Sequence, residues 1–485
     1  MVSTTFVPVV MPRCSATPAS VVPAAMSVEA KSWTVLAVGS LVVAGLLSFA
    51  VVVGRLPVLS RIIDDPLFFK RCLVVHVDLA LVVWFYAFLG ALMAMRAPAS
   101  GGALARGAFI GAVVGVMAML TGALMRGAQP VLANYVPVID HPLFGAGLAV
   151  FFLGMLAFLL RSLAEPTAKR SELPADAAIG LQAATVLVAI AAATWVSARA
   201  GLPAGVDAYT RAEFLAWGPG HVLQAANASA MLAVWLWLIA RATGGPVLSV
   251  RAARGVFALL VLPQLAMPLL TMRGTLDTLY HSGATQLMRW GIFPAVVVVL
   301  VVGVRRVWRR GETLTPTSRG RPRSATVGVV GFGASAGLAV LGMILGACIR
   351  GSTTLVPAHY HASLGAVTMA FMAAAFFVCE AVRRDRGEGL SERTWARAKW
   401  QLATFGVGQT VFVLGFAIGG AYGLGRKAYA AEQHVRSAGE LTGLIVMGVG
   451  GLMAVAGGLW FLFLVLREMR TWWGRTAAVR ANLPT

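Results

Sequence analysis

The sequence is poor in charged residues and in cysteine. Charged residues make up 12% of its 485 positions, whereas a soluble domain has about a quarter, so a water-soluble enzyme is excluded. The four cysteines are Cys14, Cys72, Cys348 and Cys379. They lie far apart and form neither a CxxC nor a CxxCH motif. This argues against a zinc module, a thioredoxin-like site, a covalently attached c-type haem and a disulfide framework.

Acidic residues are the scarcer of the two charged kinds. The chain has 40 Lys and Arg against 19 Asp and Glu, which gives a formal net charge of +21. In a soluble protein such an excess would indicate nucleic-acid binding. Here the basic residues lie between long apolar runs, 58% of all residues are hydrophobic and the mean hydropathy is +0.79. We therefore expect a lipid bilayer as the surroundings and no nucleic-acid partner.

Apolar runs fill the chain almost from end to end. A membrane-spanning helix needs about 20 mostly apolar residues. Twelve segments meet this requirement: 33–53, 72–95, 104–125, 142–160, 177–198, 217–240, 254–272, 283–304, 325–349, 357–382, 400–424 and 441–466. The sequence predicts an all-α integral membrane protein, with one domain of about twelve transmembrane helices over 33–466. Residues 1–32 show no clear apolar segment followed by a cleavage site and are expected to be an N-terminal tail, and 467–485 a C-terminal tail.

The loops predict the orientation of the chain. With the N-terminus inside, the inner segments carry most of the Lys and Arg, whereas the acidic residues divide almost evenly between the two sides. A bias of the basic residues alone is the signature of the cytoplasmic side. We therefore expect both termini in the cytoplasm and a multi-pass protein of a bacterial inner membrane.

In this topology every histidine lies in the outer part of the membrane or in an outer loop. The seven are His76, His141, His221, His281, His359, His361 and His434. A single histidine at a helix end is usually an interfacial or capping residue, and we keep this interpretation for His141 and His434. Several imidazoles at one depth on different helices favour a cofactor layer.

The segment His359-Tyr360-His361 is the most informative. Residues two apart on an α-helix point about 200° away from each other, so one helix can present an imidazole to a cofactor on each of its sides. Histidine is a common axial ligand of haem iron. We therefore expect two haems flanking this helix, one of them with a second histidine from another helix, either His76 or His221.

These residues resemble the catalytic subunit I of the haem–copper oxidase superfamily, which contains cytochrome oxidases and nitric oxide reductases. The resemblance covers nearly the whole chain. The matching segments are HVDLA at 76–80, WGPGH at 217–221, VPAHYH at 356–361 and GLGRK at 423–427. It implies a twelve-helix bundle of the subunit I type that binds two haems.

The resemblance also implies roles for single residues. His76 and His361 would be the axial ligands of a low-spin haem, and His359 the proximal ligand of the high-spin haem at the catalytic site. His221 would be a ligand of the non-haem metal. Arg426 and Lys427 would hold the haem propionates, as two cations can.

The sequence departs from the family at the non-haem metal. The family supplies two adjacent histidines from its seventh helix, but residues 262–272 contain none. The nearest is His281, which is either a ligand that folds back or a loop residue. The family's tyrosine four residues after the sixth-helix histidine is replaced by Ala225, and Tyr280 is the candidate redox tyrosine from the other side. Copper or another non-haem metal therefore stays open.

The function that the resemblance implies is that of a respiratory terminal oxidase. Electrons would pass from the low-spin to the high-spin haem and reduce O2 to water. The alternatives are a nitric oxide reductase-like enzyme and a copper-free dihaem protein for electron transfer or gas sensing. A transporter would leave the histidine layer unexplained. Because the chain lacks its own c-type haem and two-cysteine copper motifs, we expect a partner subunit that carries one of them, or a quinol, as the electron donor.

Acidic residues are rare within the predicted spans. Asp78 and Glu380 are the only ones, and an ionisable residue inside a membrane is a functional candidate by default. They do not outline an acid-lined proton route, so proton pumping is not predicted.

Overall fold

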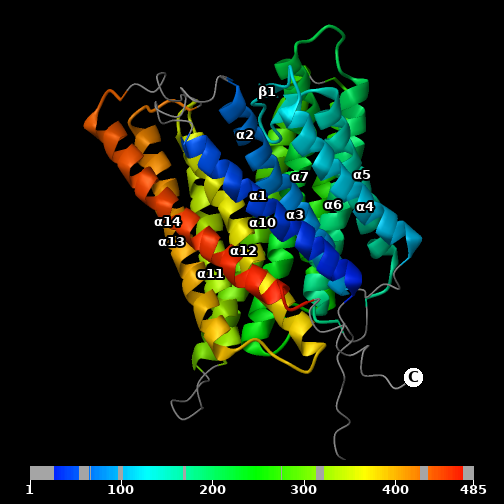
Figure 1. The fold of residues 1–485 in the computed structure, drawn as a ribbon, viewed down its shortest axis with the longest axis vertical. Helices are drawn as coiled ribbons and strands as arrows, with labels where there is room; N and C mark the ends of the chain where they lie inside the picture. The colour runs from blue at the N-terminus through cyan, green and yellow to red at the C-terminus, as the bar shows by residue number, and fades with distance from the viewer. Residues whose placement is uncertain are drawn as a thin grey trace, which may run out of the picture.

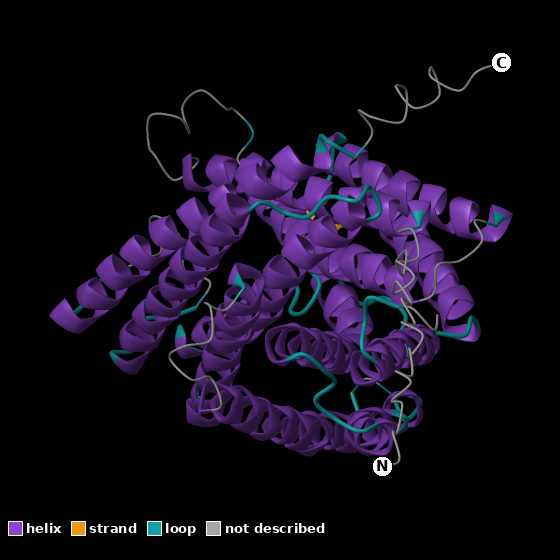
Figure 2. Cartoon of the chain, turned by 90° about the horizontal axis from the view of Figure 1, so that it is seen from below, coloured by secondary structure: helices purple, strands orange, loops and turns teal. Residues whose placement is uncertain are grey.

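The computed structural model describes residues 27–53, 65, 67–96, 102–167, 171–274, 276–312, 322–426 and 435–472. Helices make up nearly all of this part of the chain (Figures 1 and 2). The α-helices are α1 (Val28–Val53), α2 (Phe68–Val77), α3 (Trp84–Arg96), α4 (Ala103–Leu124), α5 (Pro142–Ala164), α6 (Ala175–Ala200), α7 (Ala208–Thr243), α8 (Val250–Gln264), α9 (Ala266–Thr271), α10 (Thr278–Glu312), α11 (Arg323–Cys348), α12 (Leu355–Arg384), α13 (Glu392–Ala421) and α14 (Ala438–Met469). A π-helical segment, η2 (Asp78–Val83), joins α2 to α3, and a small antiparallel hairpin consists of β1 (Gln129–Val131) and β2 (Val138–Asp140).

Twelve stretches within the described residues are long and apolar enough to cross a membrane. The predicted number of spans is confirmed, and the protein is a multi-pass integral membrane protein. The second span runs without a break through α2, η2 and α3. The seventh, predicted as one helix over 254–272, is interrupted between α8 and α9, next to Pro263 and close to Pro268. Proline has no backbone N–H and its ring clashes with the preceding turn, which explains the interruption.

The spans that carry the histidines of the 76–80, 217–221 and 356–361 segments are the most buried ones. In their apolar windows, 72% of the second span and 83% of the sixth and tenth spans are buried inside the protein, against 33–67% for the other nine. These three spans form the centre of the bundle, and the others shield them from lipid. The fold therefore places the candidate histidines on interior helices.

The helices α13 and α14 pack with their backbones in contact (Figure 1). Gly443, Gly450 and Gly457 recur every seven residues on α14, which keeps them on one face of the helix. A Cβ atom at Gly450 would collide with the backbone of Phe412 on α13. Only glycine permits this close approach.

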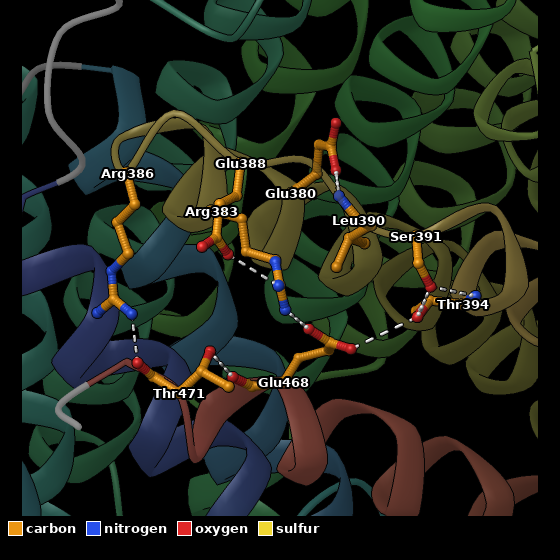
Figure 3. A network of polar contacts seen from close by, with 9 residues as sticks. All are labelled: Glu380, Arg383, Arg386, Glu388, Leu390, Ser391, Thr394, Glu468 and Thr471. Atoms are coloured by element: carbon orange, nitrogen blue, oxygen red, sulfur yellow. Dashed lines mark hydrogen bonds and ion pairs between the residues drawn. The ribbon is translucent and has the colours of Figure 1, made fainter. Parts of the chain in front are cut away.

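Ion pairs join the ends of α12 and α14 at one face of the bundle (Figure 3). Arg383 donates to the carboxylate of Glu468 at 2.6 Å and to that of Glu388 at 2.9 Å. Near the start of α1, Lys31 interacts electrostatically with Asp385 of the same face. Both ends of the described chain therefore lie on the same side, as an even number of spans requires. That this side is cytoplasmic stays a prediction.

Candidate functional site

The first turns of α12 carry His359 and His361, and the two side chains leave the helix toward different neighbours. The Nδ1–H of His359 donates to the carbonyl of Gly342 on α11 at 2.7 Å. The ring of His361 stacks on the ring of Phe416 on α13, with centroids 5.3 Å apart and planes 8° from parallel. The two-residue spacing predicted this divergence.

The helices α2 and α12 bring His76 and His361 together. The Nδ1–H of His76 donates to the carbonyl of Ala44 on α1 at 2.8 Å, and its ring interacts electrostatically with that of His361. Both rings lie inside the bundle but are partly accessible. No described residue forms a hydrogen bond to the Nε2 of His76 or to either ring nitrogen of His361. This pair from two helices fits the predicted axial ligands of one haem.

The pocket for His359 is shaped by glycine. A Cβ at Gly346 of α11 would lie 2.7 Å from Nδ1 of His359 and 2.8 Å from Cε1, so a larger residue would displace the ring. The Nε2 of His359 also has no hydrogen-bond partner among the described residues. An imidazole whose Nδ1–H is bonded to a carbonyl and whose Nε2 is open is the usual state of a metal-ligating histidine. His359 therefore fits the predicted ligand of the second haem.

His221 lies on α7, which Asp207 caps at its N-terminus. Its side chain is buried, with 4% exposed. The Nδ1–H donates to the carbonyl of Trp217 at 2.7 Å, and Nε2 lies 3.0 Å from the hydroxyl oxygen of Tyr135. Because Nδ1 carries the proton, Nε2 accepts from the phenol. Both nitrogens of His221 are therefore engaged by protein groups.

Tyr135 lies in the loop between β1 and β2 and is held there by its neighbours. Its φ is +65°, and the N–H of Val136 donates to the carbonyl of Asn134 at 2.9 Å, which closes a γ-turn. Asn134 donates from its backbone N–H and its Nδ2 to the two carboxylate oxygens of Glu213 on α7, at 2.5 and 2.9 Å. Burial, with the nearby Glu213 carboxylate, raises the pKa of the Tyr135 phenol. The phenol therefore stays protonated at neutral pH and is the donor to His221.

Tyr280 and His281 lie in the first turn of α10 and not in a loop, which corrects the predicted start of this span at 283. The carboxylate of Asp277 accepts from the backbone N–H groups of the first turn, including that of Tyr280 at 3.3 Å, so the helix begins earlier than its apolar run. The ring of Trp217 lies 4.2 Å from that of His221 and 4.5 Å from that of His281, between centroids. The Tyr280 side chain is fully buried, and its hydroxyl lies close to Thr271 and Gly218.

The donors around His221 do not form a three-ligand metal site. Over the part of the chain that the structure describes, no three His, Cys, Asp or Glu side chains gather in a way that could hold a metal ion. His281 interacts electrostatically with His221, and the Trp217 ring contacts both. Two imidazoles, an indole and two phenols (Tyr135 and Tyr280) therefore meet where the resemblance expects copper with three histidines.

Arg426 lies beside the start of α12. Its Nε donates to the hydroxyl of Ser352 at 2.9 Å, and Thr353 pairs with Gly425 in an isolated β-bridge. It also interacts electrostatically with Tyr209 in the first turn of α7. The guanidinium is thus near the first turns of α7 and α12, two of the helices that carry candidate ligands, as a propionate anchor requires. The predicted Lys427 lies outside the described residues, as does His434.

The two acids predicted within spans differ in their surroundings. Asp78 is fully buried, and neither of its carboxylate oxygens has a hydrogen-bond partner in the part of the chain that the structure describes. Glu380 accepts from the backbone N–H of Leu390 at 2.5 Å and pairs with Arg384 at 3.2 Å. Because the helices continue beyond their apolar centres, they contain further acids, among them Glu213 on α7.

Sequence reasoning missed Tyr135 and its anchor Asn134–Glu213. The chain has seven tyrosines, several of which lie between the predicted spans, so no sequence signal singled out Tyr135. Nothing in the spacing of residues 134, 213 and 221 indicates that they meet. The hairpin of β1 and β2 brings them together.

Comparisons with known proteins found a family profile, two uncharacterized relatives and a solved structure with a similar fold. The family profile described as cytochrome c and quinol oxidase polypeptide I matches residues 30–454. An uncharacterized protein of Aquifex aeolicus (strain VF5) is 29% identical over 350 residues, which cover 71% of this chain and 83% of that protein. The uncharacterized protein RP382 of Rickettsia prowazekii (strain Madrid E) is 22% identical over 500 residues, covering 91% and 96%.

A solved structure shares the fold. It is described as a cryo-EM structure of a heme-copper terminal oxidase dimer, and it superposes with a TM-score of 0.64 at 17% sequence identity. The match covers 93% of this chain and 84% of that chain. At this identity the likeness concerns the arrangement of the helices.

Proposed function

The chain belongs to the cytochrome c and quinol oxidase polypeptide I family, and from this premise we propose that it is the haem-binding catalytic subunit of a respiratory terminal oxidase that reduces O2 to water. The proposal names two haem positions, one between His76 and His361 and one at His359. A haem supplies electron transfer and, where one face of its iron is open, binding of a small gas. The residues of this chain determine where that chemistry takes place.

The observation that carries the proposal is the common state of His76 and His359. Each donates its Nδ1–H to a backbone carbonyl of a neighbouring helix, at 2.8 and 2.7 Å, and the Nε2 of each has no hydrogen-bond partner among the described residues. The carbonyl bond fixes the tautomer and the direction of the ring before any ligand binds. His361 completes the set from the other side of α12, against the ring of Phe416.

The proposed function also needs a cation for the haem propionates and a donor of electrons. Arg426, next to the first turns of α7 and α12, is placed to neutralise a carboxylate of a haem propionate. Electrons would arrive from a partner subunit with a c-type haem or copper, or from a quinol, since the four cysteines of the chain form no motif for either centre.

The test of the haem positions is a haem count on the purified full-length protein. The pyridine haemochrome assay is expected to give about two haems per chain. His76→Ala and His361→Ala should each remove the low-spin spectrum, and His359→Ala the other haem. His141→Ala is the matched control, because the His141 side chain only accepts a hydrogen bond from the N–H of Leu143 at the start of α5. A wild-type protein without haem would refute the proposal.

A second candidate is a copper-free dihaem protein for electron transfer or gas binding. The hydrogen bond between Tyr135 and Nε2 of His221 favours it, because it occupies a nitrogen that a copper site would use. Turnover separates the two candidates. Uptake of O2 with a reduced donor supports the oxidase, consumption of NO alone supports a nitric oxide reductase, and gas binding without turnover supports the second candidate.

A further inference from the structure

His221 differs from the other two carbonyl-bonded histidines at one atom. All three donate their Nδ1–H to a backbone carbonyl. In His76 and His359 the Nε2 has no hydrogen-bond partner among the described residues. In His221 the Nε2 accepts a hydrogen bond from the phenol of Tyr135, with 3.0 Å between the oxygen and the nitrogen. The nitrogen that would bind a metal is therefore already bonded.

The position of Tyr135 is built and does not depend on this one bond. Asn134, the residue before Tyr135, donates two hydrogen bonds to Glu213. Glu213 lies about two helical turns before His221 on α7. Gly220, next to His221, leaves the space for the ring, because a Cβ there would lie 2.7 Å from Cβ and Cδ1 of Tyr135. The positive φ of Tyr135 is a strained backbone conformation for a non-glycine residue, and these contacts have to offset its cost.

The remaining donors are too few for a copper site. His281 is the second imidazole near His221, and the ring of Trp217 contacts the rings of both histidines, 4.2 and 4.5 Å away between centroids. Copper in proteins prefers several imidazole or sulfur ligands. The nearby Tyr280 adds a buried phenol, which is neither an imidazole nor a sulfur ligand. Binding a metal at Nε2 would require the displacement of Tyr135 from its anchored turn.

We propose that the hydrogen-bonded pair of Tyr135 and His221 takes the place of the non-haem metal, so that this chain binds haem but no copper. The inference deepens the proposed function, since it describes the same site, and it rests on the haem positions proposed above. A gas at the site would then face a phenol and an imidazole instead of a second metal.

The test counts metals and haems separately in the purified full-length protein. After incubation with excess Cu(I) and removal of loosely bound metal, the wild type should contain haem but no more than trace copper. Tyr135→His supplies a third imidazole, and it should gain about one copper per chain. Adding His221→Ala to this variant should abolish the gain. Tyr422→Phe, which changes an exposed tyrosine, is the control and should behave as the wild type.

Two results would overturn the proposal. The first is a wild type that binds about one copper per chain in a form that His221→Ala removes, with the haem content unchanged. The second comes from Tyr135→Phe, which keeps the ring and tests the bond even where Tyr135→His fails to fold. The vibrational difference spectrum of wild type minus Tyr135→Phe contains the bands of the Tyr135 phenol. These bands should be those of a phenol that donates a hydrogen bond, and bands of a non-donating phenol would contradict the proposal. Loss of haem in the wild type would instead refute the proposed function.

Discussion

Replacing Gly346 by alanine should remove the second haem and leave the first. The added Cβ would lie 2.7 Å from Nδ1 of His359, about 1 Å inside ordinary contact distance. The ring of His359 therefore has to move away from α11. Because Gly342 lies on the same helix, the hydrogen bond from the ring to its carbonyl is lost as well. Overpacking costs about 1–3 kcal/mol and the hydrogen bond about 1 kcal/mol. The sum, about 2–4 kcal/mol, corresponds to roughly 30- to 700-fold weaker binding at this position.

The assay is the pyridine haemochrome ratio together with the optical spectrum of the purified variant. The ratio should fall from about two haems per chain toward one, with the low-spin spectrum retained, because His361 leaves α12 toward α13 and not toward α11. The control is Gly337→Ala on the same helix, where a Cβ meets nothing within 4 Å. If Gly346→Ala kept both haems and the wild-type spectrum, His359 would not be the ligand of the second haem.

Three further predictions concern the surroundings of the site. Asn134→Ala should release Tyr135 by removing a side-chain bond to Glu213, an effect of about 1 kcal/mol visible as faster hydrogen exchange of the β1–β2 hairpin; unchanged exchange would argue against the anchor. Backbone hydrogen bonds, first of all from the N–H of Leu279, lower the pKa of Asp277 from its ordinary 3.8. Its contribution to stability is therefore present above that value and lost as the pH falls through the lowered pKa, and Asp277→Asn should abolish this acid dependence in thermal melts. Gly450→Val should separate α13 from α14 and lower the thermal midpoint, whereas Gly448→Val, in open space on the same helix, should not.

The sequence was sufficient for the parts of the structure that local patterns determine. Twelve apolar runs predicted the twelve spans, because a bilayer demands about 20 apolar residues for each crossing. The spacing of His359 and His361 predicted that they face different neighbours, since this follows from helical geometry alone. The start of α10 was placed too late because a capping aspartate, Asp277, and not hydropathy, determines where the helix begins.

Contacts between distant segments were beyond the reach of the sequence. Tyr135 contacts His221 although 86 positions separate them in the sequence. It does so through a turn in which Tyr135 has a positive φ, a conformation usually predicted only for glycine or asparagine. Whether an imidazole nitrogen is open or bonded depends on such partners. The resemblance could therefore name His221 as a ligand, while its hydrogen bonds had to come from the structure.

The glycine contact between α13 and α14 has a consequence for how the protein is assembled. These two spans follow each other in the chain and contact each other through backbone, so they can associate as a hairpin from local information. Yet α13 also supplies Phe412 and Phe416, the aromatic rings beside His361. The helix α13 thus completes the wall of a site whose two histidines lie on helices that are synthesised before it. A nascent chain that ends before α13 has both imidazoles in place, with that wall still missing.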